Sequence, residues 1–179
     1  MDKKEVRAYV RELKRQLSPD EKLRRSETIM QRLEQAEPFV RSKVVLLYWS
    51  MADEVQTHRF VERWYKEKTV LLPCVDGDDL RLRQYTGSEC LVAGEQFGIG
   101  EPASDIPEWD DLTAIDVIAV PGVAFDRENN RMGRGRGFYD RLLKSAPRAT
   151  KIGLAFDFQI LESIPTEPHD IRMDMVISD

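Results

Sequence analysis

The apolar positions near the N-terminus recur every three or four residues. Positions 6, 9, 10, 13 and 17 carry Val, Tyr, Val, Leu and Leu, which predicts an amphipathic helix over residues 3–17. Ser18, Pro19 and Glu21 then supply an N-cap, a proline at the first helical position and the partner of a capping box. A second helix is therefore expected to about Gln35, and Pro38 is expected to end it.

Short apolar runs between polar segments predict the strands. The run KVVLLYW at 43–49 is almost continuously apolar, which suits a strand buried on both faces, as in a parallel sheet. Further strands are expected at 69–75, 80–85, 114–120, 151–156 and 173–177, and helices at 57–64 and 137–144. Residues 86–111 are rich in Gly, Pro, Glu and Asp and are predicted to be mostly loop, although loops of this length usually have a function or contain unrecognised structure.

This succession of strands and helices predicts an α/β fold. We expect one domain over residues 1–179, built as three layers (α/β/α) around a mostly parallel central sheet, as in Rossmann-like proteins. The sequence has no internal repeat, no low-complexity tract and no change of composition that would mark a domain boundary.

Composition and charge exclude several classes of protein. The 27 Lys and Arg residues against 32 Asp and Glu give a net charge of −5, which argues against non-specific nucleic-acid binding by the chain as a whole. No apolar stretch is long enough to cross a membrane, and the charged start is unlike a secretory signal. Two cysteines are too few for a disulfide framework. We expect a cytoplasmic protein that makes no membrane contact and, since no long apolar heptad or exposed apolar strand stands out, a monomer.

The segment from Pro121 to Leu143 carries the clearest chemistry. It runs from a predicted buried strand into a predicted helix, which is where open α/β sheets bind ligands. Its glycines at 133, 135 and 137 alternate with arginines, and such a loop can hold an anion with its N–H groups and guanidinium forks. Asp140, near the start of the helix, could cap it or hold a Mg²⁺ that bridges phosphates. From composition alone, an anion site and a solvated basic turn remain equally open.

The complete string PGVAFDRENNRMGRGRGFYDR resembles the signature of the 5-formyltetrahydrofolate cyclo-ligase family. Three other segments are similar to the same family and occur in the same order. They are KKEVR at 3–7, YWSMADEVQT at 48–57 and HDIRMD at 169–174. The likeness covers almost the whole chain, with Phe138 at a position where the family often has tyrosine.

The resemblance implies a fold of the cyclo-ligase type and an ATP- and Mg²⁺-dependent ring closure. In that reaction 5-formyltetrahydrofolate becomes 5,10-methenyltetrahydrofolate, through a phosphorylated formyl group (an iminium phosphate), with release of ADP and phosphate. The nucleophiles belong to the substrate, so the absence of a Ser/His/Asp or Cys/His triad from the sequence is no obstacle. The protein has to position two ligands and to neutralise phosphate charge.

The resemblance also assigns roles to residues. Catalysis would fall to Arg131, Arg134 and Tyr139. ATP would be bound by Lys3, Lys4, Arg7, Arg131, Gly133, Arg134, Gly135, Arg136, Gly137, Phe138 and Tyr139. The folate would contact Trp49, Met51, Glu54, Arg134, Gly135, Arg136, Gly137 and Phe138. Mg²⁺ would be held by Asp140 and Asp170, with Asp174 as a neighbouring candidate.

Simpler interpretations of the same residues stay open at this stage. Lys3 and Arg7 could face solvent from an amphipathic helix, Trp49 could be a core residue, and Glu54 could be a loop carboxylate near a helix N-terminus. His58 is predicted to be a surface residue at a helix start. Two other functions compete with the enzyme: a non-catalytic phosphate- or nucleotide-binding module, and RNA binding through RGRG at 134–137. The acidic balance and the single, flanked RGRG argue against RNA.

Overall fold

The computed structural model describes residues 1–95 and 98–179. Its central sheet has six strands in the described part of the chain. In spatial order they are β11 (Met175–Ser178), β9 (Thr150–Ala155), β6 (Val117–Val120), β1 (Val44–Leu46), β2 (Thr69–Asp76) and β3 (Asp79–Gln84). Neighbouring strands pair in parallel except β3, which forms an antiparallel hairpin with β2. The predicted α/β fold with a mostly parallel sheet is confirmed.

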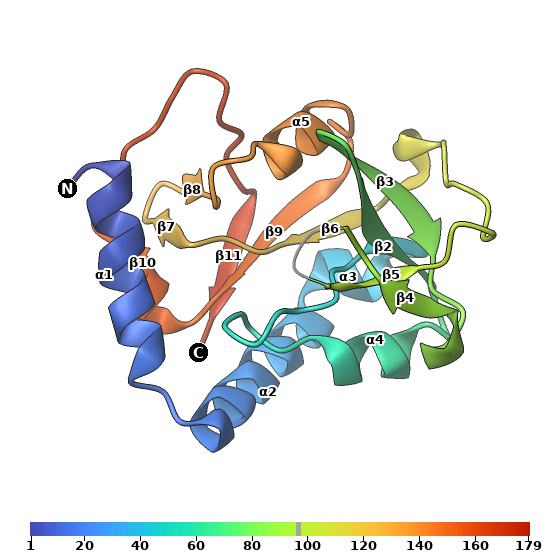
Figure 1. The fold of residues 1–179 in the computed structure, drawn as a ribbon, viewed down its shortest axis with the longest axis horizontal. Helices are drawn as coiled ribbons and strands as arrows, with labels where there is room; N and C mark the ends of the chain where they lie inside the picture. The colour runs from blue at the N-terminus through green and yellow to red at the C-terminus, as the bar shows by residue number, and fades with distance from the viewer. Residues whose placement is uncertain (96–97) are drawn as a thin grey trace.

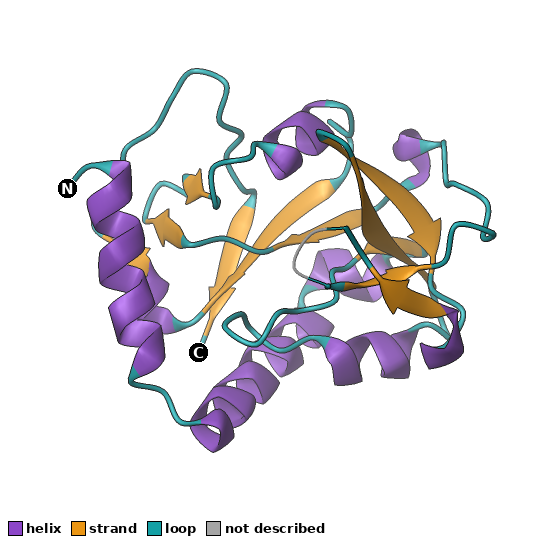
Figure 2. Cartoon of the chain, viewed as in Figure 1, coloured by secondary structure: helices purple, strands orange, loops and turns teal. Residues whose placement is uncertain are grey.

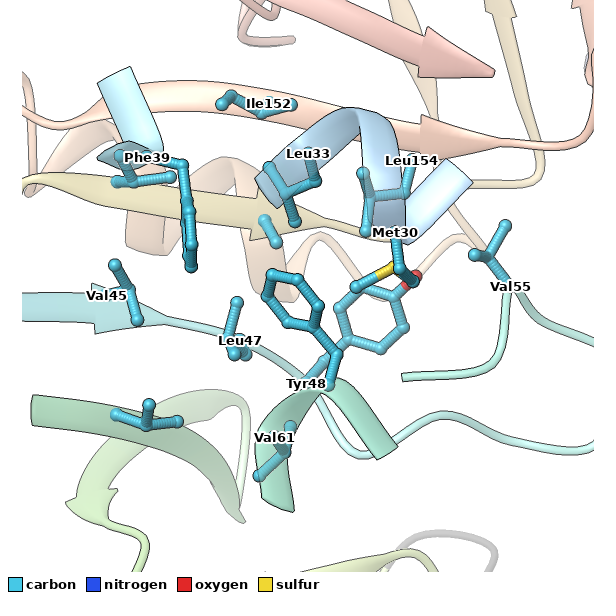
Figure 3. Packing of buried hydrophobic residues seen from close by; sticks show 14 of the residues in the cluster. Met30, Leu33, Phe39, Val45, Leu47, Tyr48, Val55, Val61, Ile152 and Leu154 are labelled. Carbon is cyan, nitrogen blue, oxygen red and sulfur yellow. The ribbon is translucent and has the colours of Figure 1, made fainter. Parts of the chain in front are cut away.

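Helices lie on both faces of this sheet (Figures 1 and 2). On one face are α2 (Pro19–Gln35), α3 (Glu37–Arg41) and α4 (His58–Trp64), and on the other is α5 (Phe138–Lys144). Figure 3 shows how Leu33, Phe39 and Val61 from the first group meet side chains of β1 and β9. Leu142 and Leu143 of α5 pack against Leu46 and Ile118 on the opposite face. Successive side chains of a strand point to opposite faces of the sheet, so the strands contribute to two separate hydrophobic cores.

The N-terminal helix α1 (Lys3–Arg15) packs away from the main sheet, on a smaller one. Val6 and Val10 cover Ala124, Met132 and Ile164. The small sheet consists of β10 (Ile160–Leu161), β7 (Ala124–Asp126) and β8 (Arg131–Met132). Because β8 leads directly into the Gly-rich loop (residues 133–137), this packing places α1 beside that loop.

The helix starts differ in detail from the sequence predictions. Asp2 and Glu5 form a reciprocal capping box at α1, which ends at Arg15 rather than 17. At α2 the Ser18 hydroxyl accepts from the Glu21 N–H as expected, but Glu21 pairs with Arg25 at 2.9 Å and does not complete the box. Pro38 lies in the first turn of α3, a position that proline favours, so it opens a helix instead of closing one.

Two predicted loops contain strands. Residues 86–111 hold a 3-10 turn (Ser88–Cys90) and the hairpin of β4 (Leu91–Ala93) and β5 (Gly100–Pro102). A second 3-10 turn (Leu112–Ala114) delays the start of β6 to Val117. Within the basic segment, Asp126 Oδ1 accepts from the N–H groups of Glu128 and Asn130 and turns β7 into β8. These strands have two or three residues each, too few for a periodic pattern.

Candidate functional site

A cavity of about 620 Å³ opens at the carboxyl ends of three parallel strands. Tyr48 and Trp49 follow β1, Pro73 and Val75 belong to the end of β2, and Pro121 follows β6; all five line the cavity. Open α/β sheets bind ligands at this edge. The Gly-rich loop, the 50–54 loop, α1 and the 167–170 turn supply further walls, together with residues of α5, β3 and β5.

The Gly-rich loop, residues 133–137, forms the basic wall. Gly135 and Gly137 have φ angles of 112° and 71°, a region that other residues rarely adopt, so the loop needs glycine there. Arg7 of α1 donates from Nε to the Gly133 carbonyl at 3.2 Å. A Cβ on Gly135 would lie 3.7 Å from the Arg7 guanidinium. The helix and the loop are therefore fitted to each other, and Lys3, Arg7, Arg134 and Arg136 face one cavity.

Arg131 is a buried cation at the back of this wall. Its side chain is held by the Pro121 carbonyl, which accepts from Nε at 2.7 Å, and by the Tyr139 ring, whose centroid lies 5.2 Å from the guanidinium. Burial lowers the pKa of Arg131, while the negative charges of Asp140 and Asp170 oppose that shift. No carboxylate of the described residues lies within 4.0 Å of it. A buried guanidinium with no close counter-ion suits an anionic ligand.

Glu54 is the carboxylate of the opposite wall. Its Oε1 accepts from the Met51 N–H at 2.8 Å, and the Glu54 N–H donates to the Met51 carbonyl at 3.1 Å. Burial raises the pKa of Glu54, and the Met51 hydrogen bond opposes this shift. A carboxylate that is fixed in a cavity and partly desolvated is well placed to accept N–H donors of a ligand.

An aromatic stack lies beside Glu54. Trp49 stacks on His58 with centroids 3.9 Å apart and ring planes 9° apart, and it lies near Tyr85 at 5.9 Å. Gly100 of β5 also packs against Trp49, since an added Cβ on Gly100 would be 2.8 Å from Trp49 Cδ1. Trp49 is therefore both a core contact and a cavity wall. His58 begins α4 as predicted, but it is half-buried, and burial lowers its pKa while Nε2 lies 2.9 Å from the Ser50 carbonyl.

Asp140 and Asp170 both line the cavity. Asp140 Oδ1 accepts from the Ile171 N–H at 3.2 Å, and Asp170 Oδ2 accepts from the Glu167 N–H at 2.8 Å. These bonds leave each carboxylate an oxygen without a backbone donor. Lys3 pairs with Glu167 at 2.9 Å, and ligand atoms of Glu167, His169 and Asp170 lie within 4.8 Å of one another. Hard oxygen donors of this kind suit Mg²⁺, which binds few protein carboxylates and completes its shell with phosphates and water.

Two of the predicted site residues lie elsewhere. Asp174 Oδ2 accepts from the Lys151 N–H at 2.7 Å at the start of β9, and Asp174 is not among the described residues that line the cavity. It holds strands together and does not line the cavity, so we do not include Asp174 among the proposed metal ligands. Lys4 is exposed on α1, on a different face from Lys3 and Arg7, and also lies outside the lining.

Sequence reasoning missed part of the cavity wall. Glu101 of β5 is buried, accepts from the Val75 N–H at 2.8 Å, and lines the cavity with Ile99 and Leu80. Burial raises its pKa. The rule that ligands bind at strand ends would have found Tyr48, Pro73 and Pro121, but β5 lies inside a segment predicted to be loop.

Comparison with known proteins agrees with this arrangement. A family model described as the 5-formyltetrahydrofolate cyclo-ligase family matches residues 1–179. A Mus musculus protein named 5-formyltetrahydrofolate cyclo-ligase is 30% identical over 187 residues, covering 98% of this chain and 92% of its own length. An Escherichia coli protein of the same name is 30% identical over 176 residues, covering 94% and 96%. The solved structure of Aquifex aeolicus 5,10-methenyltetrahydrofolate synthetase superposes with a TM-score of 0.87 at 38% identity, covering 99% of this chain and 89% of that one.

None of the described helices has both the length and the apolar run that a bilayer crossing requires. Both cysteines are buried and free. The cytoplasmic location, the monomeric state and the lack of nucleic-acid or membrane partners stay predictions.

Proposed function

The chain belongs to the 5-formyltetrahydrofolate cyclo-ligase family, and we propose that it converts 5-formyltetrahydrofolate to 5,10-methenyltetrahydrofolate, using ATP and Mg²⁺ and releasing ADP and phosphate. The observation that carries the proposal is the composition of a single cavity. One wall offers five cationic side chains and a Gly-rich loop to phosphates, and the facing wall offers Glu54 and Trp49 to a heterocycle. A reaction between two bound ligands needs such facing walls.

The chemistry requires no nucleophilic side chain from the protein. The formyl oxygen attacks the γ-phosphorus of ATP, the bond to ADP breaks, and an N5-iminium phosphate forms. N10 of the folate then adds to the formyl carbon and loses its proton. The bond from carbon to the phosphorylated oxygen breaks, so phosphate leaves with the former formyl oxygen. The protein contributes alignment and charge stabilisation, as phosphoryl transfer generally requires.

We assign the phosphate side of the reaction to Lys3, Arg7, Arg131 and Arg134, together with the Gly-rich loop. Arg131 is the strongest candidate for the transferring phosphoryl group, because its charge is buried and fixed from behind by the Pro121 carbonyl. Desolvation strengthens its attraction for the charge that develops on phosphoryl oxygens. The Tyr139 hydroxyl lies in the same wall and is proposed to donate to that group. Arg136 and Gly137 are proposed to donate to other oxygens of the bound ligands.

We assign the folate side to Trp49, Met51, Glu54 and Phe138. The Glu54 oxygen that is not bonded to Met51 can accept from N–H donors of the pterin ring. Trp49 lines the cavity and offers an aromatic contact for the ring system, and its stacking on His58 holds the indole in place. Phe138 supplies a ring without the hydroxyl that the family often has there, so this contact is apolar.

Asp140 and Asp170 would hold Mg²⁺ through the oxygens that their backbone donors leave free. The ion, when bound, would neutralise charge on the ATP phosphates. Asp174 is not part of this proposal.

The direct test mixes the purified protein with 5-formyltetrahydrofolate, ATP and Mg²⁺ and follows the near-ultraviolet absorbance of the methenyl product. We expect a rise that requires all three components and that falls steeply in Arg131→Ala, and in Asp170→Ala at limiting Mg²⁺. No rise in the presence of measurable ATP binding would contradict the proposal and would favour a nucleotide-binding module without turnover.

A further inference from the structure

Two charged residues without a role so far, Lys14 and Asp53, form a chain of charges with Arg134. Lys14 of α1 lies 3.8 Å from Asp53 Oδ2, and Asp53 accepts two contacts from Arg134 Nη2, at 2.9 Å to Oδ1 and 3.1 Å to Oδ2. The chain joins α1, the 50–54 loop and the Gly-rich loop, which are three walls of the cavity. Figure 1 shows the loop between β1 and α4 reaching toward α1. Arg134 lines the cavity; Lys14 and Asp53 do not.

Lys14 is unusual for a lysine because its side chain is only 8% exposed. Burial lowers its pKa, and the Asp53 charge is the main influence that opposes this shift. A buried ammonium group without a carboxylate partner is energetically costly. Pairing with Lys14 therefore favours this position of the Asp53 carboxylate. Lys14 also extends the stripe of Lys3 and Arg7, since positions 3, 7 and 14 fall on one face of a helix.

The backbone on both sides of Asp53 is held as well. Lys22 of α2 donates to the Ala52 carbonyl at 2.6 Å. Gln56 Nε2 donates to the carbonyls of Met51 and Glu54 at 3.0 and 2.8 Å. Asp53 is thus a fixed acceptor, although its own side chain is 48% exposed.

Arg134 is held at only one of its nitrogens. Among the described residues, Nη2 alone has a partner, so Nε and Nη1 keep their donors. We propose that Asp53 is a positioning residue, anchored by the buried Lys14, that fixes Arg134 across the cavity mouth so that its free nitrogens face the phosphate oxygens of the nucleotide. The inference rests on the proposed function for the identity of the anion. An isolated exposed pair of this kind would contribute little, and the anchoring by Lys14 is what makes it a directional contact.

The test is a kinetic double-mutant cycle. Asp53→Asn and Lys14→Met should each lower kcat about tenfold, with the folate KM nearly unchanged. Asp53→Asn should also lower the melting temperature, because it leaves the buried Lys14 without its carboxylate, whereas Lys14→Met should not, because it removes the buried charge itself. Arg134→Ala should lower kcat further, and Asp53→Asn should then have no additional effect in that background. Lys14→Arg, which keeps the charge, should restore most of the activity. Asp157→Asn is the matched control, because it breaks an exposed 3.0 Å pair with Arg25 away from the cavity.

Additive losses from Asp53→Asn and Arg134→Ala would overturn the inference, as would full activity of Asp53→Asn. The same variants are also tested for ADP binding by calorimetry, in which Asp53→Asn should weaken affinity only when Arg134 is present. If the wild-type protein closes no folate ring yet shows this pattern with ADP, the proposed function fails and the positioning role stands. If Asp53→Asn weakens ADP binding equally with and without Arg134, the positioning role is overturned, and the three charges serve the stability of the fold instead.

Discussion

The Glu54 carboxylate is proposed to bind the folate, but its ionisation lowers the stability of the fold. Its carboxylate lies in the cavity wall, accepts one backbone hydrogen bond and has a pKa that burial raises. The folded chain therefore holds the Glu54 proton more tightly than the unfolded chain does. Stability falls as pH rises from the unfolded pKa through the raised folded pKa, so ionised Glu54 destabilises the fold at neutral pH.

Glu54→Gln should separate these two effects. Loss of a charged acceptor should raise the KM for 5-formyltetrahydrofolate at least about tenfold and leave the KM for ATP unchanged. The amide cannot ionise, so the variant should melt above the wild type at pH 8, and the difference should shrink as pH falls and wild-type Glu54 takes up its proton. Melting curves from pH 5 to 8 and steady-state kinetics measure both. An equal rise of both KM values, or a variant that melts lower at every pH, would contradict the role given to Glu54.

Also at the scale of residues, the sequence predicted the types of residue at the site better than it predicted the individual residues. The basic segment identified Arg131, Arg134 and the glycines, since their pattern is local in the chain. Asp170 and Asp174 were both metal candidates there, because they are four residues apart in one segment. Only the course of the chain sends Asp170 to the cavity and Asp174 to β9.

At the scale of elements, Asp174 joins β11 to β9 through Lys151. Asp174→Ala should cost about 1–3 kcal/mol of unfolding free energy, because it leaves a buried backbone N–H of Lys151 without its acceptor. The Mg²⁺ concentration for half-maximal activity should not change. Asp170→Ala is the comparison and should raise that concentration. Denaturant unfolding and Mg²⁺ titrations check both statements, and a shifted Mg²⁺ requirement in Asp174→Ala would return Asp174 to the metal site.

Elements marked by apolar spacing or by a continuous apolar run were predictable, and short elements without either were not. The two N-terminal helices follow from apolar spacing and the five parallel strands from apolar runs, with their ends shifted by a few residues. By contrast, β4, β5, β7, β8 and β10 have two or three residues each, so pairing across the chain, rather than any local pattern, defines them. Glu101 and Gly100 enter the cavity on β5, so this part of the site could not be foreseen.

At the scale of the whole molecule, the fold brings three distant segments to one cavity. Residues 3–7 and 167–170 come from opposite ends of the chain, and the Gly-rich loop follows β8 between them. The small sheet under α1 and the Lys3–Glu167 pair hold the two ends beside that loop. The central claim is therefore about one reaction space in which phosphate and folate meet, not about two independent binding sites.

Transfer of the formyl oxygen tests that claim most directly. 5-Formyltetrahydrofolate labelled with ¹⁸O in the formyl group is incubated with the protein, ATP and Mg²⁺, and the released phosphate is analysed by mass spectrometry. The account predicts one labelled oxygen in each phosphate, with methenyl product, ADP and phosphate formed in equal amounts. Unlabelled phosphate, or ATP hydrolysis without ring closure, would contradict it.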